Sequence, residues 1–292
     1  MVKKFFVVVC CLGFIALAFS DVNGFVDAGR RGVLLFGQNV MPILFPFFFA
    51  SGLLVEVGFF RGFKRLGKAA PVFALSLLAG YPTGARLLGD LYKRGDMTRQ
   101  EALRTATYTS TCSPIFIIAT LGACFYQSIT AGVLVFASTT LGAILNGLVY
   151  CKVSFRAPLT QRGEESQVLP VSSSKNDMAT AISNSLYSAI QNILAVGGLV
   201  VVFFIITNMI GGGVLVSGLL EMTNGVFQAS VAAPSSLIIP TAIVTFGGLC
   251  VAVQGFVFMS SFKMPLWFYL LYKVTHTIFA CLICLILVAI LF

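Results

Sequence analysis

Lys273 and His276 are ionisable side chains within the last apolar stretch of the chain. Their spacing places them on one face of a helix. An ionisable group surrounded by apolar sequence is a candidate functional group, and a cation beside an imidazole could bind an anionic or heteroaromatic solute. Two simpler interpretations stay open, in which Lys273 extends to a polar boundary and His276 is an ordinary interior residue.

A carboxylate also stands in apolar sequence, where Glu221 follows a glycine-rich stretch. A charged acid at membrane depth is costly, so Glu221 is a second candidate for solute contact, together with Thr223 and Asn224 just after it. The alternative is that the segment is short and that Glu221 reaches water at the interface. Further along, Gln254 could act as both donor and acceptor.

The clearest irregularity is a helix breaker inside the apolar stretch 69–88. Glycine and proline interrupt the helical hydrogen-bond ladder there, and freed backbone groups are costly in hydrocarbon. Such a break is tolerated where it is buried in protein or lines a wet cavity, and transporters use it to hold solutes. We therefore predict a solute-binding segment formed by Gly80, Tyr81, Pro82, Thr83 and Gly84, with Arg86 shortly after it.

Small polar side chains form a further candidate group directly before Pro114. Ser110, Thr111 and Ser113 could point at the solute. They could equally cap the backbone groups that Pro114 frees, and the two roles are compatible.

The composition defines the class of protein that must position these groups. The 292 residues are 58% hydrophobic and 10% charged, with a mean hydropathy of +0.97. Soluble domains average about 25% charged residues. We therefore predict an all-α polytopic membrane protein. The net charge of +9 falls in basic blocks between apolar runs, which is typical of cytoplasmic loops and argues against a nucleic-acid partner.

Apolar segments define the expected helices. The first is either a retained membrane helix or a cleaved signal peptide, and we favour the retained helix. We expect a multi-pass protein of the cytoplasmic membrane, with its N-terminus in the cytoplasm. The segments lie near 5–20, 33–60, 69–88, 106–125, 128–151, 187–210, 214–233, 235–262 and 266–292.

The segment 69–88 has basic residues at both ends, so it cannot be a single crossing. We predict a re-entrant hairpin that enters from the cytoplasm and turns at Gly80–Gly84. A weak internal echo pairs this break with Gly247 and Gly248, which predicts an inverted second repeat with its own hairpin. A chance similarity of apolar sequence is the alternative. The expected units are 1–32 (first helix and connection), 33–153 (first repeat), 154–180 (cytoplasmic linker) and 181–292 (second repeat).

Sequence motifs of enzymes are not found, and the eight cysteines lie in or at the end of apolar stretches. We expect no catalytic activity, no cofactor and no metal. The expected partners are a small solute, the lipid bilayer, a coupling ion (proton or sodium) and, as a further option, a second copy of the chain.

Across nearly the whole chain beyond residue 25, the sequence resembles the YlbJ-type (SpoVV) sporulation integral membrane proteins of the Gate, or nucleoside-recognition, superfamily. The chain differs in being short, with a brief central linker. The resemblance implies a fold related to concentrative nucleoside transporters and movement of dipicolinic acid during spore formation. The residues that carry it are MPILFPFF at 41–48, GYPTGAR at 80–86, LYKRG at 91–95, SPIFI at 113–117, LEMTNG at 220–225 and FGGLCV at 246–251.

The predicted function is secondary transport of a small anionic or heteroaromatic solute, similar to dipicolinic acid or a nucleoside, bound between two re-entrant hairpins. The rival prediction is a membrane scaffold or assembly factor that keeps the fold without transport. A transporter needs a polar cavity at mid-depth, whereas a scaffold would fill that space with apolar side chains.

Overall fold

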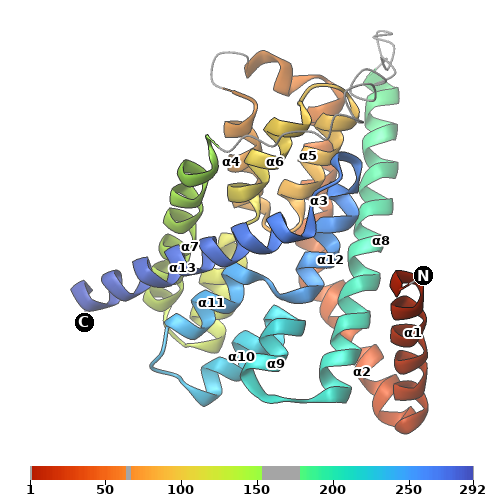
Figure 1. The fold of residues 1–292 in the computed structure, drawn as a ribbon, viewed down its shortest axis with the longest axis vertical. Coiled ribbons are helices and arrows are strands. Elements are labelled where there is room, and N and C mark those ends of the chain that lie inside the picture. The colour runs from red at the N-terminus through yellow and green to blue at the C-terminus, as the bar shows by residue number, and fades with distance from the viewer. Residues whose placement is uncertain (1, 64–66, 153–177, 292) are drawn as a thin grey trace.

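The computed structural model describes residues 2–63, 67–152 and 178–291, and all regular elements in these ranges are helices (Figure 1). This agrees with the all-α prediction. Most of the predicted cytoplasmic linker 154–180 lies outside the described residues.

The chain begins with a bent pair of helices, α1 (Val2–Ser20) and α2 (Val22–Leu35). Asp21 makes the bend, because its carboxylate accepts a hydrogen bond from the backbone N–H of Gly24 at 2.9 Å and so caps α2. A π-helical turn, η1 (Phe36–Val40), then leads into α3 (Met41–Glu56). Both α2 and α3 pack along α8 (Met178–Ile210).

The helix pair α4 (Ala69–Ala79) and α5 (Thr83–Lys93) surrounds the first predicted break. The outer ends of the pair lie together, since the Lys68 ammonium donates to the backbone oxygen of Asp96. The neighbouring short helix η2 (Phe59–Phe63) reaches the same place through a 2.9 Å ion pair between Arg61 and Asp96. The chain therefore enters and leaves this pair at one end of the molecule.

An interrupted helix follows. Helix α6 (Arg99–Thr109) starts at a capping box of Thr98 and Glu101, and it ends where residues 110–113 leave helical geometry. A π-helix, η3 (Ile115–Phe125), continues the path, and α7 (Ile129–Tyr150) returns beside it.

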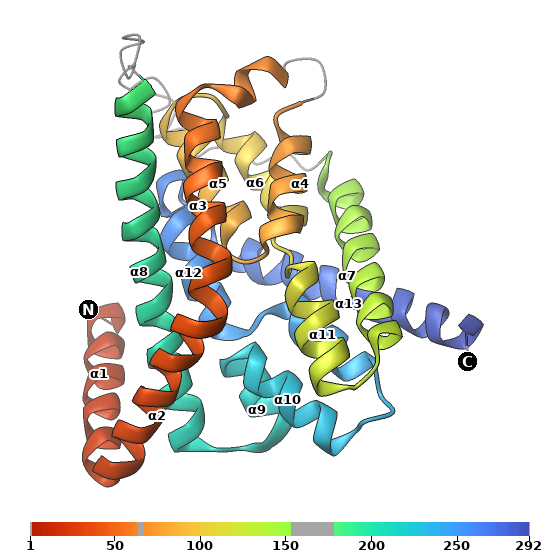
Figure 2. The same cartoon turned by 180° about the vertical axis from the view of Figure 1, so that it is seen from behind.

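A similar order of elements follows α8. A short packed pair, α9 (Gly213–Leu220) and α10 (Met222–Ala232), is followed by the interrupted helix α11 (Ile238–Phe246) and α12 (Gly248–Met259). The short η5 (Ser260–Phe262) and the long α13 (Leu266–Leu291) complete it. Figures 1 and 2 show α4 and α5 at one end of the molecule and α9 and α10 at the opposite end.

The position of the second short pair corrects the sequence analysis. Gly247 and Gly248 do not turn the chain back, because residues Ile238–Phe262 form one apolar span of 25 residues. Gly247, with a φ of +84°, only interrupts this span. The chain instead reverses at Glu221, and the two helices that meet there approach closely: a Cβ on Gly225 would lie 2.3 Å from Gly218 Cα.

Four helical stretches in the described ranges are long and apolar enough to cross a membrane, or five if the bent N-terminal pair counts as one. Large apolar side chains on the last of them, such as Leu282 and Ile286, face outward. An apolar outer surface is stable in lipid rather than in water. The chain is an integral membrane protein. The long spans are α7, α8, Ile238–Phe262 and α13.

Candidate functional site

The two breaks found in the sequence meet in the middle of the molecule. The hydroxyl of Tyr81, at the first break, donates to the carbonyl oxygens of Thr245 at 3.0 Å and Val244 at 3.2 Å. These carbonyls belong to the last turn of α11, where helix geometry leaves carbonyl groups without intrahelical partners. The sequence pairs these segments as equivalent parts of a predicted repeat, and the structure brings them into contact.

Lys273 joins the same point from α13. Its side chain is 0% exposed, and its Nζ donates to Thr245 O at 2.6 Å, to Tyr81 Oη at 2.8 Å and to Ser110 O at 3.5 Å. The ammonium also lies 4.6 Å from the centre of the Tyr81 ring, a cation–π distance. One side chain therefore connects the first break, the end of α11 and the end of α6.

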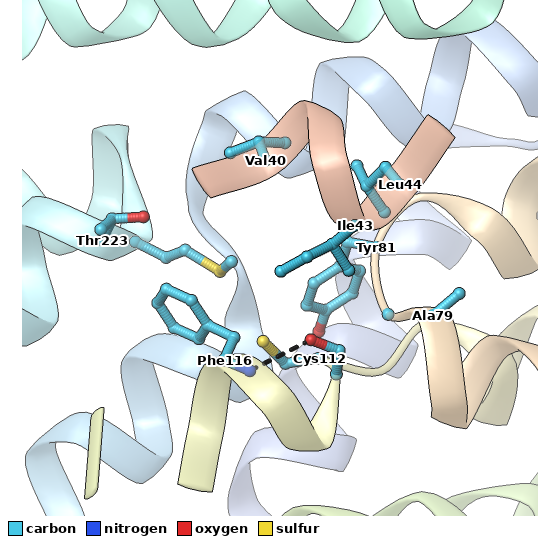
Figure 3. Close-up of a pocket in the computed structure, with 11 residues that line it drawn as sticks. Val40, Ile43, Leu44, Ala79, Tyr81, Cys112, Phe116 and Thr223 are labelled. Atoms are coloured by element: carbon cyan, nitrogen blue, oxygen red, sulfur yellow. Dashed lines mark hydrogen bonds between the residues drawn. The ribbon is translucent and has the colours of Figure 1, made fainter. Parts of the chain in front are cut away.

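A pocket of about 110 Å³ lies beside this crossing, and we call it the central pocket (Figure 3). Its wall combines both short helix pairs with the interrupted helix α6–η3 and with α3. The labelled side chains in Figure 3 show that Val40 and Leu44 lie on one side of the pocket and Phe116 on the other. The lining residues are Val40, Ile43, Leu44, Ala79, Gly80, Tyr81, Cys112, Ser113, Phe116, Met222 and Thr223.

Gly80 holds the first break against the second polar segment. Its φ is +77°, and a Cβ at this position would lie 2.6 Å from the backbone nitrogen of Ser113. Only glycine combines this backbone conformation with such a close approach. The Ser113 hydroxyl then accepts from the Phe116 N–H at 3.3 Å, which starts η3 at the edge of the central pocket.

Glu221 is buried, and both of its carboxylate oxygens are engaged by backbone. They accept from the N–H groups of Thr223 at 3.0 Å and Asn224 at 2.9 Å. These bonds cap α10 and place a negative charge at the positive end of that helix. Glu221 does not line the central pocket, whereas Thr223 does. Its carboxylate therefore fixes the turn that positions Thr223.

Three predicted polar residues lie away from the central pocket. Arg86 is buried against α3, where Nη1 donates to Phe48 O at 2.6 Å. The Gln254 amide contacts Cys250 Sγ at 3.2 Å. His276 lies between α13 and α7, with its Nε2 3.0 Å from Thr139 O. Lys273 and His276 therefore contact different elements, although they share one face of α13.

The remaining predicted residues divide between the pocket and its supports. The Thr111 hydroxyl donates to Ser76 O at 3.4 Å, so it links the interrupted helix to α4. Gly84 lies against the backbone of Thr109, since a Cβ there would be 2.2 Å from that carbonyl oxygen. Gly80, Tyr81, Ser113 and Thr223 line the pocket, and Pro82, Thr83, Ser110, Asn224, Gly247 and Gly248 lie at the breaks behind it.

Sequence reasoning missed the apolar part of the pocket and one polar support. Phe116 and Met222 carry no local signal that separates them from lipid-facing residues of the same type. Asn146, on α7, is completely buried and donates through Nδ2 to Thr107 O at 2.7 Å and Tyr272 O at 3.1 Å. An amide within an apolar span was the signal that could have found it.

Comparison with known proteins gives one informative match. Over 236 residues the chain is 25% identical to the "Sporulation integral membrane protein YlbJ" of Bacillus subtilis (strain 168), which covers 72% of the chain. The chain is related to the YlbJ-type sporulation membrane proteins. It spans 57% of the length of that relative. No family model matches the chain, and neither does any solved structure. The YlbJ-type resemblance is thus confirmed, and the wider Gate superfamily assignment stays a prediction.

Proposed function

We propose that the protein is a secondary transporter of the cytoplasmic membrane that binds a small heteroaromatic or anionic solute in the central pocket. The observation that carries this proposal is the position of the pocket. Its lining includes Gly80 and Tyr81 at the tip of the first helix pair and Met222 and Thr223 at the tip of the second. Interrupted helices around a cavity are the arrangement that secondary transporters use for their substrates.

The size of the pocket narrows the solute class. An engineered protein cavity of about 150 Å³ binds one benzene molecule, so a pocket of about 110 Å³ must widen to admit dipicolinate and must widen further to admit a base joined to ribose. Tyr81 and Phe116 offer aromatic surface, and Ser113 and Thr223 offer hydroxyl groups. These features favour a single-ring heteroaromatic of the dipicolinic-acid type over a complete nucleoside.

The charge near the pocket favours an anionic solute. Lys273 lies directly behind Tyr81 and donates to its hydroxyl at 2.8 Å, so a group that carries positive charge when protonated stands at that wall. In a low-dielectric environment this field is weakly screened and attracts a carboxylate. The Glu221 carboxylate is turned into the α10 backbone, which limits its repulsion of such a solute.

The arrangement of the two helix pairs on opposite sides of the pocket supports a transport mechanism with alternating access. The pairs approach the pocket from opposite ends of the molecule (Figure 1). We infer that they are re-entrant hairpins of two inverted repeats, with α4–α5 on the cytoplasmic side because basic residues such as Arg61 and Lys68 gather at its outer ends. Movement of one pair would open the pocket to one side of the membrane, and movement of the other would open it to the opposite side.

The test is ligand binding by the purified protein, followed by flux into proteoliposomes. Dipicolinate should raise the melting temperature in a saturable way, and uridine should do so weakly or not at all. We expect Phe116→Ala and Thr223→Ala to weaken dipicolinate binding about tenfold each, the effect of losing one good contact. Phe19→Ala and Ser260→Ala, at exposed positions, are the matched controls and should bind as the parent does.

The scaffold alternative makes the opposite prediction. A folded, monodisperse protein that binds neither dipicolinate, uridine nor other small carboxylates, and that gives no flux in vesicles, would exclude the transport proposal. Binding that survives unchanged in both pocket variants would keep transport but remove the central pocket as its site.

A further inference from the structure

Two helices end at the same point with their carbonyl groups directed inward. Thr245 belongs to the last turn of α11, and Ser110 directly follows α6. The last carbonyls of a helix lack intrahelical partners and carry the partial negative charge of the helix dipole. Their convergence, with the Tyr81 hydroxyl between them, creates a small region of negative potential that consists only of neutral oxygen atoms.

The Lys273 ammonium fills this region. It has three N–H groups, and three oxygen acceptors surround it at 2.6, 2.8 and 3.5 Å. No ion pair among the described residues includes Lys273. A buried charge is costly unless it is compensated, so the compensation here comes from helix ends and a hydroxyl rather than from a carboxylate.

Neutral oxygens from interrupted helices are the ligands that bind sodium in many secondary transporters. Half-helix C-terminal ends and unwound carbonyls coordinate the metal ion there. Hard monovalent and divalent cations prefer such oxygen ligands, and an ammonium group satisfies the same electrostatic demand. In this chain the cation is covalently attached to α13 and cannot be exchanged with the solution.

We propose that Lys273 is a tethered cation. It occupies a sodium-type site at the point where the breaks at 80–84, at 110–113 and at Gly247 meet. As a consequence, the protein holds its interrupted helices together without a bound metal ion, and transport does not use a sodium gradient. Removal of the ammonium, with its side chain shortened, leaves an oxygen-lined space that accepts Na⁺.

Melting temperature in different salts tests this proposal without a solute. The purified protein is heated in NaCl, KCl or choline chloride at equal ionic strength. The parent protein should melt at the same temperature in all three. Lys273→Ser should melt lower in choline, and added NaCl should restore stability by several degrees in a saturable way, because a ligand that binds only the folded state stabilises it. Lys152→Ser, at an exposed position, is the control and should show no salt preference.

Two results would overturn the proposal. One is a sodium-specific stabilisation of the parent protein, which requires no variant to fold. The other is a folded Lys273→Ser or Lys273→Gln protein that melts equally in all three salts, which would make Lys273 a packing and hydrogen-bonding residue only. The claim about coupling rests on the proposed transport function, but the melting experiment does not. Absence of any solute flux would therefore refute transport and leave the cation site to be judged separately.

Discussion

The hydroxyl of Tyr81 lies 3.0 Å from the carbonyl oxygen of Thr245, although the two residues are 164 positions apart in the chain. This contact joins the tip of the α4–α5 pair to the end of α11. It satisfies a carbonyl that the helix leaves without a partner, and the same hydroxyl accepts a hydrogen bond from Lys273. The two halves of the protein are therefore connected through polar groups at their interrupted points.

The first prediction concerns this hydroxyl. Tyr81→Phe should lower the free energy of unfolding by about 1–3 kcal/mol, because a buried ammonium N–H and a buried carbonyl each lose a partner. Chemical denaturation in detergent, followed by circular dichroism, measures the change. Tyr187→Phe removes the same atom from a side chain that is 66% exposed, and it should be neutral. Equal stability of the two variants would contradict the connecting role of Tyr81.

Glycine at position 80 gives the second prediction. Gly80→Ala should destabilise the protein by about 1–3 kcal/mol from the backbone conformation alone, since φ +77° with ψ −165° is a region almost restricted to glycine, and by more because the new methyl group meets the Ser113 backbone. It should also weaken solute binding, since the first break can no longer reach Ser113 at the pocket wall. Gly198→Ala, in α8 with open space around it, should be neutral or slightly stabilising. Thermal melting with and without dipicolinate separates the two effects.

The role of Glu221 leads to the third prediction. If its carboxylate serves to cap α10, Glu221→Asn should keep both the fold and solute binding, because asparagine is a good N-cap residue. Glu221→Ala should lose about 1 kcal/mol of stability, which is typical of a lost cap. A Glu221→Asn protein that melts like the parent but no longer binds dipicolinate would show that the carboxylate contacts the solute instead.

The difference between Gly80 and Glu221 explains how far the sequence could predict the fold. Around Gly80, the glycines and the proline of GYPTG are local signals, and the basic residues on both sides indicate a return to the same face. The turn at Glu221 depends on one extended residue and on close packing of Gly218 against Gly225, which no local pattern announces. The pair Gly247–Gly248 was the stronger signal, although it only interrupts a span.

The residues of the candidate site also divide into those with a local sequence signal and those without one. Residues at the breaks could be found from the cost of broken backbone in a membrane, and Tyr81, Ser113 and Thr223 line the central pocket. The roles of Lys273 and His276 could not be separated, because both are single polar groups on an apolar helix. Their difference arises from partners far along the chain, at Tyr81 for the lysine and on α7 for the histidine.

The last prediction concerns Asn146, which holds three helices together. Its Nδ2 donates to Thr107 O, in the last turn of α6, and to Tyr272 O on α13, while its Oδ1 accepts from the Thr275 hydroxyl at 2.7 Å. Asn146→Ala should therefore cost about 2–3 kcal/mol, since a buried carbonyl at a helix end loses its donor and a cavity remains. Asn208→Ala is the matched control, because that exposed amide donates to Phe204 O within its own helix. Denaturant titration of both variants gives the comparison, and a cost for Asn146→Ala no larger than for the control would refute its connecting role. Because the α6 end also carries Ser110, loosening it should reduce dipicolinate affinity as well as stability.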